Sequence, residues 1–288
     1  MKILRTIPEM RHACAQARAA IGPNATLGLV PTMGALHQGH LSLIRAAKQQ
    51  CDIVAATIFV NPTQFGPNED FARYPRTFDA DCALLEAERV DLLFAPSVEE
   101  MYPLGSSRTY VEAPGIGDRL DGLSRPGHFR GVATVVAKLF NIATPDRAFF
   151  GQKDAAQVAV LRAMVEDLNF PLQIVVCPTM RDPDGLALSS RNHYLTPEQR
   201  SQALALSQAL AATTSLAAQG THSTEHLRTF LLDHLKASPG ITVDYAEFVD
   251  PKTLEPIPDV LNGALIAVAA FVGQTRLIDN ALLPALPQ

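Results

Sequence analysis

The sequence lacks the features of secreted, membrane-spanning and cysteine-ligated metal proteins. It has no tryptophan and four scattered cysteines without a C-x-x-C pair, Cys14, Cys51, Cys82 and Cys177. Isolated cysteines of this kind indicate a reducing compartment. No apolar run approaches the ~18–20 residues that a membrane-spanning helix needs. The N-terminal stretch MKILRTIPEM has no apolar signal-peptide region. We therefore expect a cytoplasmic protein with no membrane partner.

Positive charge is also scarce. The 288 residues include 24 lysines and arginines against 29 acidic residues, which gives a net charge of −5. Proteins that grip a nucleic-acid backbone usually have a basic surface, so we expect no nucleic-acid partner. The composition does not exclude small anionic ligands, because their binding needs only a local positive site. With 47% hydrophobic residues, the chain can bury a sizeable core.

Two familiar nucleotide-binding loops are missing as well. The sequence has no G-x-x-x-x-G-K-[ST] loop, which excludes a Walker-type ATPase. It has no G-x-G-x-x-G after a predicted strand, so a dinucleotide site is unsupported. A nucleotide site in this chain must be built from other residues.

Apolar runs alternate with amphipathic stretches through the first two thirds of the chain. Continuous apolar runs predict strands at residues 25–31, 52–60, 90–96, 147–150 and 172–178. Amphipathic stretches between them predict helices at residues 41–50, 131–143 and 155–168. This repetition implies right-handed crossovers, and so an α/β fold with a Rossmann-like, doubly wound parallel sheet.

The pattern changes in the last third of the chain. Alanine-rich helices are predicted at residues 197–219 and 223–237, and strands at residues 242–250, 264–273 and 275–279. The stretch CPTMRDPDG between the two patterns is typical of a boundary. We therefore predict a Rossmann-like domain at residues 1–180 and a smaller C-terminal α+β domain at residues 181–288.

The stretch PTMGALHQGHLSLIRAAK places two histidines, His37 and His40, at the start of a predicted helix that follows a strand. Ligands of open α/β sheets bind at the carboxyl ends of strands. The free N–H groups of a helix N-terminus suit phosphate, and Gly34 and Gly39 allow close approach to the backbone. An imidazole at this position can donate a proton or a hydrogen bond to a phosphate oxygen.

A metal site and a pair of surface histidines are the alternatives for this motif. First-row metals normally take three or four protein ligands. The other six histidines offer no partner at an obvious spacing. Polar segments elsewhere in the chain favour the phosphate interpretation.

Polar residues also follow two other predicted strands. Asn61 and Gln64 offer neutral amides that suit a hydroxyl or a carboxylate, although Asn-Pro alone is simply a turn. In FFGQKDAAQ, Lys153 brings a cation to a second helix start, and Asp154 is a natural N-cap. Gln157 follows one turn into that helix. We expect the two helix starts to lie side by side and to bind phosphate.

Two further segments carry polar clusters. Ser189, Ser190 and Arg191 in LALSSRN can grip a polyphosphate, and the turn-rich approach to them suggests a mobile lid. Arg125 and His128 in RPGHFRGV precede a helix and are explained equally well as a structural turn.

These segments, in this order and spacing, resemble the pantothenate synthetases, or pantoate–β-alanine ligases. The H-x-G-H pattern is the signature of the nucleotidyltransferase superfamily to which they belong, and the resemblance extends to TRLIDN near the C-terminus. It implies ATP-dependent condensation of (R)-pantoate with β-alanine through pantoyl adenylate, with release of pyrophosphate and AMP. It also implies a Mg²⁺ cofactor, a cytoplasmic homodimer, and a small domain that closes over the site.

The resemblance also implies roles for individual residues. His40 is the proton donor, and the other catalytic residues are His37, Lys153, Ser189, Ser190 and Arg191. The implied ATP site comprises Met33, Gly34, His37, Gly39, His40, Gly151, Gln152, Lys153, Asp154, Met180, Leu188, Ser189, Ser190 and Arg191. Gln64 and Gln157 hold pantoate, with Asn61 beside them, and Gln64 also serves β-alanine. Asp81 is the position of a magnesium-linked carboxylate.

The sequence departs from the family pattern at a few of these positions. Gln152 replaces a common glutamate, and Met180 replaces a valine or isoleucine whose backbone contacts adenine. Cys82 stands where some relatives have a second acid, which weakens the metal assignment of Asp81.

Three other functions are weighed against this one. A nucleotidyltransferase that releases a nucleotide-linked product, or acts on another small carboxylate or phosphate substrate, shares H-x-G-H but has no use for Gln64 and Gln157. A nucleotide-binding regulator has no need of the retained histidines, Lys153 and Arg191. An aminoacyl-tRNA synthetase has a basic surface and a tRNA-binding domain, for which the sequence offers no candidate.

Overall fold

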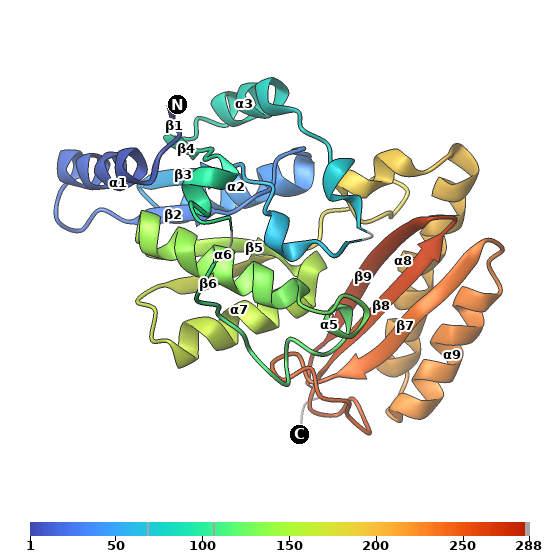
Figure 1. The fold of residues 1–288 in the computed structure, drawn as a ribbon. Helices are drawn as coiled ribbons and strands as arrows, with labels where there is room; N and C mark the ends of the chain where they lie inside the picture. The colour runs from blue at the N-terminus through green and yellow to red at the C-terminus, as the bar shows by residue number, and fades with distance from the viewer. Residues whose placement is uncertain (68, 106, 286–288) are drawn as a thin grey trace.

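The computed structural model describes residues 1–67, 69–105 and 107–285, which form two sheets (Figure 1). The larger sheet has six strands in the order β1-β4-β3-β2-β5-β6. They are β1 (Lys2–Leu4), β2 (Leu27–Val30), β3 (Ile53–Thr57), β4 (Leu92–Phe94), β5 (Arg147–Gly151) and β6 (Gln173–Cys177). Every neighbouring pair is parallel, which confirms the predicted α/β class.

Helices cover both faces of this sheet. They are α1 (Ile7–Ile21), α2 (Gln38–Gln50), α3 (Phe78–Ala87), α4 (Val98–Met101), α5 (Asp121–Ser124), α6 (His128–Ala143) and α7 (Ala155–Asp167). Side chains of successive strand residues point to opposite faces. Leu29 accordingly packs in one core with α1, α6 and α7, and Val30 in another with α2 and α3. The sheet is therefore doubly wound, as predicted.

Sequence reasoning missed the first two elements, β1 and α1. β1 is three residues long, too short to show an alternating pattern. α1 begins with a capping box, in which the Thr6 side chain accepts from the Glu9 N–H and the Glu9 carboxylate accepts from the Thr6 N–H. This signal was present in the sequence and could have located the helix.

A smaller antiparallel sheet follows in the order β7-β8-β9. Its elements are α8 (Pro197–Ala218), α9 (Thr224–Lys236), β7 (Ile241–Val249), β8 (Ala264–Val272) and β9 (Thr275–Leu283). The two helices pack on the sheet around a hydrophobic core of their own. In Figure 1, β9 is the strand nearest the larger sheet. It continues to Leu283 instead of ending at Asp279 as predicted, because its pairing with β8 persists through the polar residues.

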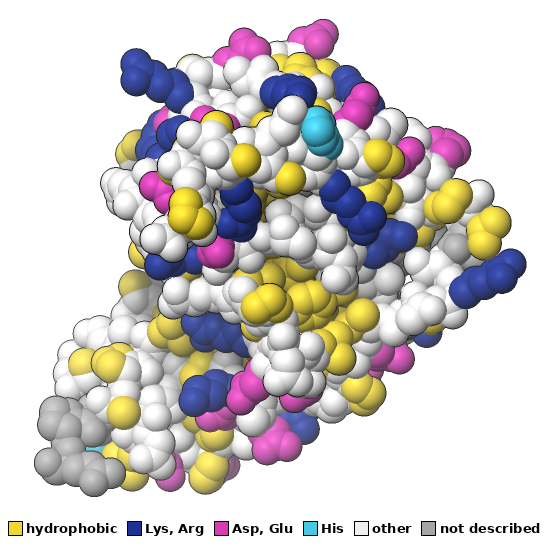
Figure 2. All heavy atoms as spheres, turned by 90° about the vertical axis from the view of Figure 1, so that its left-hand side faces the viewer, with side chains coloured by type: hydrophobic (Ala, Val, Ile, Leu, Met, Phe, Trp, Pro, Cys, Tyr) yellow, Lys and Arg dark blue, Asp and Glu magenta, His cyan; other side chains and the backbone are white. Residues whose placement is uncertain are grey.

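The surface carries both signs of charge. On the face drawn in Figure 2, basic and acidic side chains lie next to each other around a group of hydrophobic ones. Within the described ranges, no helix combines the length and the apolar character needed to cross a bilayer.

Candidate active site

The strand order of the larger sheet changes direction between β2 and β5. β3 and β4 lie on one side of β2, and β5 and β6 on the other. In doubly wound sheets, ligands bind at the carboxyl ends of the strands at such a point. The segment after β2 carries His37 and His40, and the segment after β5 carries Lys153. These groups come from adjacent strands, as expected.

A cavity of ≈ 220 Å³ lies at this point. Most of the predicted site residues line it, namely Met33, His37, Gly39, His40, Asn61, Gln64, Gly151, Lys153, Asp154, Gln157, Met180, Leu188, Ser189, Ser190 and Arg191. Gly34, Asp81 and Gln152 do not line it. A larger cleft of ≈ 740 Å³ adjoins it, reaches β9, and shares Lys153 and Gln157 with it.

The two histidines are fixed by the first turn of α2. His37 is the N-cap, and its Nδ1 accepts the N–H of Gly39 at 3.1 Å. The Nδ1 of His40 in turn accepts the N–H of His37 at 3.3 Å. A Cβ on Gly39 would lie 2.8 Å from the Cε1 of His37, so the tight turn requires glycine. Because each Nδ1 is an acceptor, each neutral ring carries its proton on Nε2.

Both rings are neutral in the free protein at neutral pH. Burial, and to a smaller extent the positive charge of Lys153, lower the pKa of His37 to about 4. Burial, with a smaller contribution from His37, likewise lowers the pKa of His40 to about 3. The pair therefore presents two Nε2–H donors without carrying a charge. A bound polyanion would raise both pKa values, because it favours the imidazolium form.

Lys153 and its neighbours form the second part of the site. Lys153 lies in a short 3-10 helix, η3 (Gln152–Asp154), and its Nζ is 3.7 Å from the Oδ1 of Asp154. Asp154 occupies the N-cap position of α7, as predicted, but its side chain makes no capping hydrogen bond. Gln152 turns away from the cavity, and its amide donates to the side chain of Asn280 at 3.1 Å.

The amide of Gln64 is held by a buried network. Its Oε1 accepts from the Nδ2 of Asn61 at 3.1 Å, and its Nε2 lies 3.1 Å from the sulfur of Met33. The Oδ1 of Asn61 accepts from the hydroxyl of Tyr102 at 2.9 Å, and its Nδ2 also donates to the carbonyl of Gly131. Asn61 is 1% exposed. The structure therefore gives Asn61 the position of a residue that orients Gln64.

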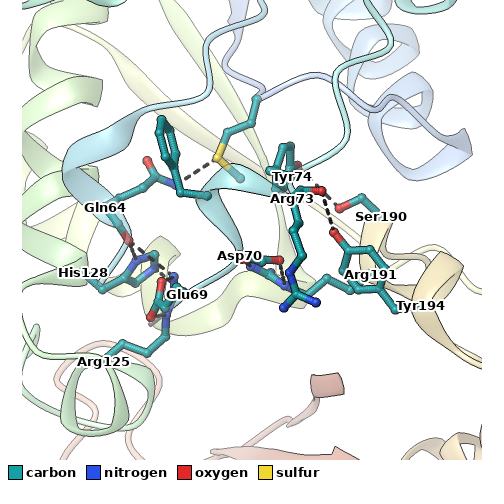
Figure 3. Close-up of polar contacts among 12 residues, drawn as sticks. Gln64, Glu69, Asp70, Arg73, Tyr74, Arg125, His128, Ser190, Arg191 and Tyr194 are labelled. Atoms are coloured by element: carbon teal, nitrogen blue, oxygen red, sulfur yellow. Dashed lines mark hydrogen bonds and ion pairs between the residues drawn. The ribbon is translucent and has the colours of Figure 1, made fainter. Parts of the chain in front are cut away.

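The segment that carries Ser189, Ser190 and Arg191 meets the segment that follows Gln64 (Figure 3). The side chain of Ser189 caps the 3-10 helix η4 (Ser190–Tyr194). Arg191 pairs with both carboxylate oxygens of Asp70, through Nε at 3.1 Å and Nη2 at 3.0 Å. The predicted phosphate-binding guanidinium is therefore already neutralised in part.

The carboxylate of Asp81, the predicted metal ligand, is used inside the protein. Asp81 is 1% exposed. Its two oxygens accept from the N–H groups of Ala35 and Leu36, at 2.9 and 2.8 Å, and from the hydroxyl of Thr77. The carboxylate thus holds the loop before His37. Over the described parts of the chain, no group of three or more His, Cys, Asp or Glu side chains could hold a metal ion.

Sequence reasoning missed several residues of the site. Asp70 begins the 3-10 helix η2 (Asp70–Ala72) and Tyr74 follows it, with its hydroxyl 3.5 Å from the Oγ of Ser190. Glu69 pairs with Arg125, which makes the RPGHFRGV cluster part of the site wall. Asn280 belongs to TRLIDN, a segment whose role the sequence did not reveal. No local sequence pattern predicts these contacts, since each joins segments that are far apart in the chain.

Comparison with known proteins gives a consistent result. The sequence model described as Pantoate-beta-alanine ligase matches residues 2–282. A pantothenate synthetase of Acidobacterium capsulatum is 57% identical over 100% of this chain and 98% of its own length.

Solved structures agree. A pantothenate synthetase from Thermus thermophilus is 48% identical, with a TM-score of 0.89 over 98% of this chain and 99% of its own. A pantoate-beta-alanine ligase from Francisella tularensis, complexed with beta-gamma ATP and beta-alanine, is 36% identical with a TM-score of 0.78 over 98% and 97%. The chain therefore belongs to the pantoate–β-alanine ligase family.

Proposed function

We propose that the protein condenses (R)-pantoate with β-alanine to form pantothenate, at the expense of ATP. Membership of the ligase family supports this function. The observation that carries it is the meeting of two kinds of group in one cavity. His37, His40 and Lys153 offer donors for phosphate, and Gln64 and Gln157 offer neutral amides for a small hydroxy acid.

In the first step, a carboxylate oxygen of pantoate attacks the α-phosphorus of ATP. The bond from that phosphorus to the bridging oxygen breaks, and pyrophosphate leaves with the bonding electron pair. Negative charge builds up on the phosphate oxygens in this step. It is stabilised by the Nε2–H donors of His37 and His40 and by the ammonium of Lys153. Such preorganised donors stabilise the transition state more than the ground state. We assign proton donation to His40: the bound polyphosphate raises the pKa of this ring, so that it takes up a second proton and gives it to the leaving pyrophosphate.

In the second step, the neutral amine of β-alanine attacks the carbonyl carbon of pantoyl adenylate. The C–O bond to the phosphate breaks, AMP leaves, and the nitrogen loses a proton as the amide forms. The side-chain amide of Gln64 orients both pantoate and the incoming amine. Asn61 holds that amide in place. The 740 Å³ cleft gives β-alanine a route to the adenylate.

For the remaining groups we assign supporting roles. Ser189, Ser190 and Arg191 bind phosphate oxygens, and the loop Gly151–Asp154 and residues Met180 and Leu188 line the ATP site. Mg²⁺ would be held mainly by the phosphates of ATP, since it usually takes few protein ligands, and would neutralise part of their charge. We derive no step through Asp81, because its oxygens hold backbone N–H groups instead.

The proposal extends to the organisation of the protein. Residues 1–180 form the domain that binds ATP and pantoate, and residues 181–288 form the smaller domain that closes over the site. Family membership supports a cytoplasmic homodimer. Light scattering of the purified protein tests the dimer directly, and a monomer mass at micromolar concentration would contradict it.

Pyrophosphate release from ATP, Mg²⁺ and pantoate, with and without β-alanine, tests the function. We expect release limited to about one turnover with pantoate alone, and sustained release with equimolar AMP after β-alanine is added. A stable adenylylated product would favour a nucleotidyltransferase instead. No release with pantoate would mean that another small carboxylate is the substrate.

A further inference from the structure

Asn280 on β9 holds the backbone on both sides of Lys153. Its Nδ2 donates to the carbonyl oxygens of Gln152 and Lys153, each at 2.9 Å. Its Oδ1 accepts from the side-chain amide of Gln152 at 3.1 Å. Asn280 is 6% exposed, so these bonds are formed away from bulk water. They join residues that are 127 and 128 positions apart in the sequence.

The two carbonyls belong to the two peptide planes that flank the Cα of Lys153. Fixing both planes fixes the backbone dihedrals of Lys153, and with them the direction of its Cα–Cβ bond. A single amide with two N–H donors therefore aims the side chain of Lys153 without touching it. Asparagine supplies both donors without carrying a charge.

The neighbouring residue on β9 holds a second loop of the site. Asp279 accepts from Nη1 and Nη2 of Arg181 at 2.6 and 2.9 Å, and the same Nη1 donates to the carbonyl of Gly185 at 3.2 Å. This turn leads directly to Leu188–Arg191. The backbone N–H of Asn280 also donates to Asp279, which locks the pair together. Asp279 and Asn280, which are consecutive on β9, thus hold two loops of the proposed ATP site: the loop that carries Lys153 and the turn that leads to Leu188.

We propose that Asn280 is a positioning residue for adenylation, which sets the orientation of Lys153 and links it to the smaller sheet. The inference rests on the proposed function, because it assumes that Lys153 binds the phosphates of ATP. β9 contacts both η3 and η4, so a shift of the sheet would be passed to both loops. The small sheet does not need the side-chain amide of Asn280, because its strands are paired through backbone groups. The three polar contacts of this buried amide therefore serve the loop of Lys153.

Substitution of Asn280 tests the inference. Asn280→Ala removes both donors, and Asn280→Asp replaces them with an acceptor beside two carbonyl oxygens. We expect either change to slow single-turnover pyrophosphate release by roughly 10- to 100-fold, the scale of small misplacements in active sites. The KM for pantoate should change less than twofold. Asn141→Ala is the control, since among the described residues its exposed amide donates to the Ala137 carbonyl of its own helix.

A double-mutant cycle with Lys153→Ala separates positioning from a general structural role. Its readout is the dissociation constant of ATP, measured by calorimetry, so it does not depend on turnover. If Asn280 acts through Lys153, Asn280→Ala weakens ATP binding several-fold in the wild type and less than twofold beside Lys153→Ala. Equal losses in the two backgrounds would overturn the inference. If Asn280→Ala does not fold, Asn280→Ser, which keeps one hydroxyl donor, replaces it.

The two proposals can fail separately. A wild type that releases no pyrophosphate with pantoate contradicts the proposed function, while the ATP-binding cycle still reports on Asn280. A wild type that is active, with variants of unchanged rate and ATP affinity, contradicts the positioning role alone.

Discussion

The ring of His128 donates through Nδ1 to the backbone carbonyl of Gln64 at 2.8 Å (Figure 3). Its Nε2 accepts from Nη1 of Arg125 at 3.0 Å, and Arg125 pairs with Glu69. A Cβ on Gly131 would lie 2.3 Å from the carbonyl oxygen of Thr63, so α6 and the turn before Gln64 pack at backbone distance. The RPGHFRGV segment therefore positions Gln64, and is more than a turn.

His128→Ala should loosen Gln64 and weaken pantoate binding. We expect the KM for pantoate to rise about tenfold, the cost of losing a charge-supported hydrogen bond, with a smaller change in the KM for ATP. Steady-state kinetics measure both values. His234→Ala is the control, because its ring is exposed and its hydrogen bond among the described residues goes to the Phe230 carbonyl of its own helix. An unchanged KM for pantoate would show that His128 does not position Gln64.

Asp70→Asn should strengthen ATP binding. Asp70 pairs with Arg191 and so competes with phosphate for the guanidinium. Removing its charge frees Arg191, and we expect ATP affinity to rise roughly threefold to tenfold, as charge-assisted bonds to phosphate strengthen. Calorimetric titration with ATP measures the change. Arg191→Ala should shift the affinity in the opposite direction. Weaker binding by Asp70→Asn would mean that the pair holds Arg191 in its working position.

Local patterns predicted the parts of this molecule that depend on neighbouring residues. The periodicity of hydrophobic residues predicted the strands of the parallel sheet and the start of α2 at the histidines. The rule that ligands bind at the carboxyl ends of parallel strands predicted that Lys153 lies near these histidines. The pairing of Arg191 with Asp70 spans 121 residues, and no local signal encodes it. Asp81 illustrates the same limit, because the carboxylate faces backbone N–H groups 45 and 46 residues earlier.

Acid should destabilise the fold in a pH window set by three half-buried histidines. Burial lowers the pKa of His37 and His128 to about 4 and that of His40 to about 3, from the ordinary value of 6.5. Between pH 6.5 and 4, the unfolded chain therefore binds more protons than the folded one. The free energy of unfolding falls as pH falls through this window, by up to about 1.4 kcal/mol per pH unit for each of the three rings.

Urea unfolding at pH 7.0, 6.0 and 5.0 measures this dependence. His128→Gln removes one of the three rings and should make the slope between pH 6.5 and 5 shallower than in the wild type. His226→Gln, at an exposed position on α9, is the control and should keep the wild-type slope. Parallel pH profiles for wild type and His128→Gln would rule out the buried ring as a cause.

His40→Ala should leave folding and ATP binding close to normal and remove most of the first half-reaction. General acid help is worth typically ~10²–10⁴-fold, so pyrophosphate release should slow by about that factor. His40→Gln keeps an N–H donor but cannot transfer a proton. A rate for His40→Gln near that of the wild type would assign hydrogen bonding, not proton donation, to His40.

Asp81→Asn distinguishes a loop-holding carboxylate from a metal ligand. The amide keeps one acceptor oxygen but places an NH2 donor against a backbone N–H donor, so the variant should lose about 1–3 kcal/mol of unfolding free energy. Its Mg²⁺ concentration for half-maximal activity should equal that of the wild type, because in the proposed mechanism the ATP phosphates, and not Asp81, hold the metal. Urea unfolding and Mg²⁺ titration of pyrophosphate release give the two values. A large rise in the Mg²⁺ requirement with unchanged stability would return Asp81 to the metal site. Thr77→Val removes only the hydroxyl that supports the same carboxylate, and a smaller loss of stability with the same Mg²⁺ requirement is expected.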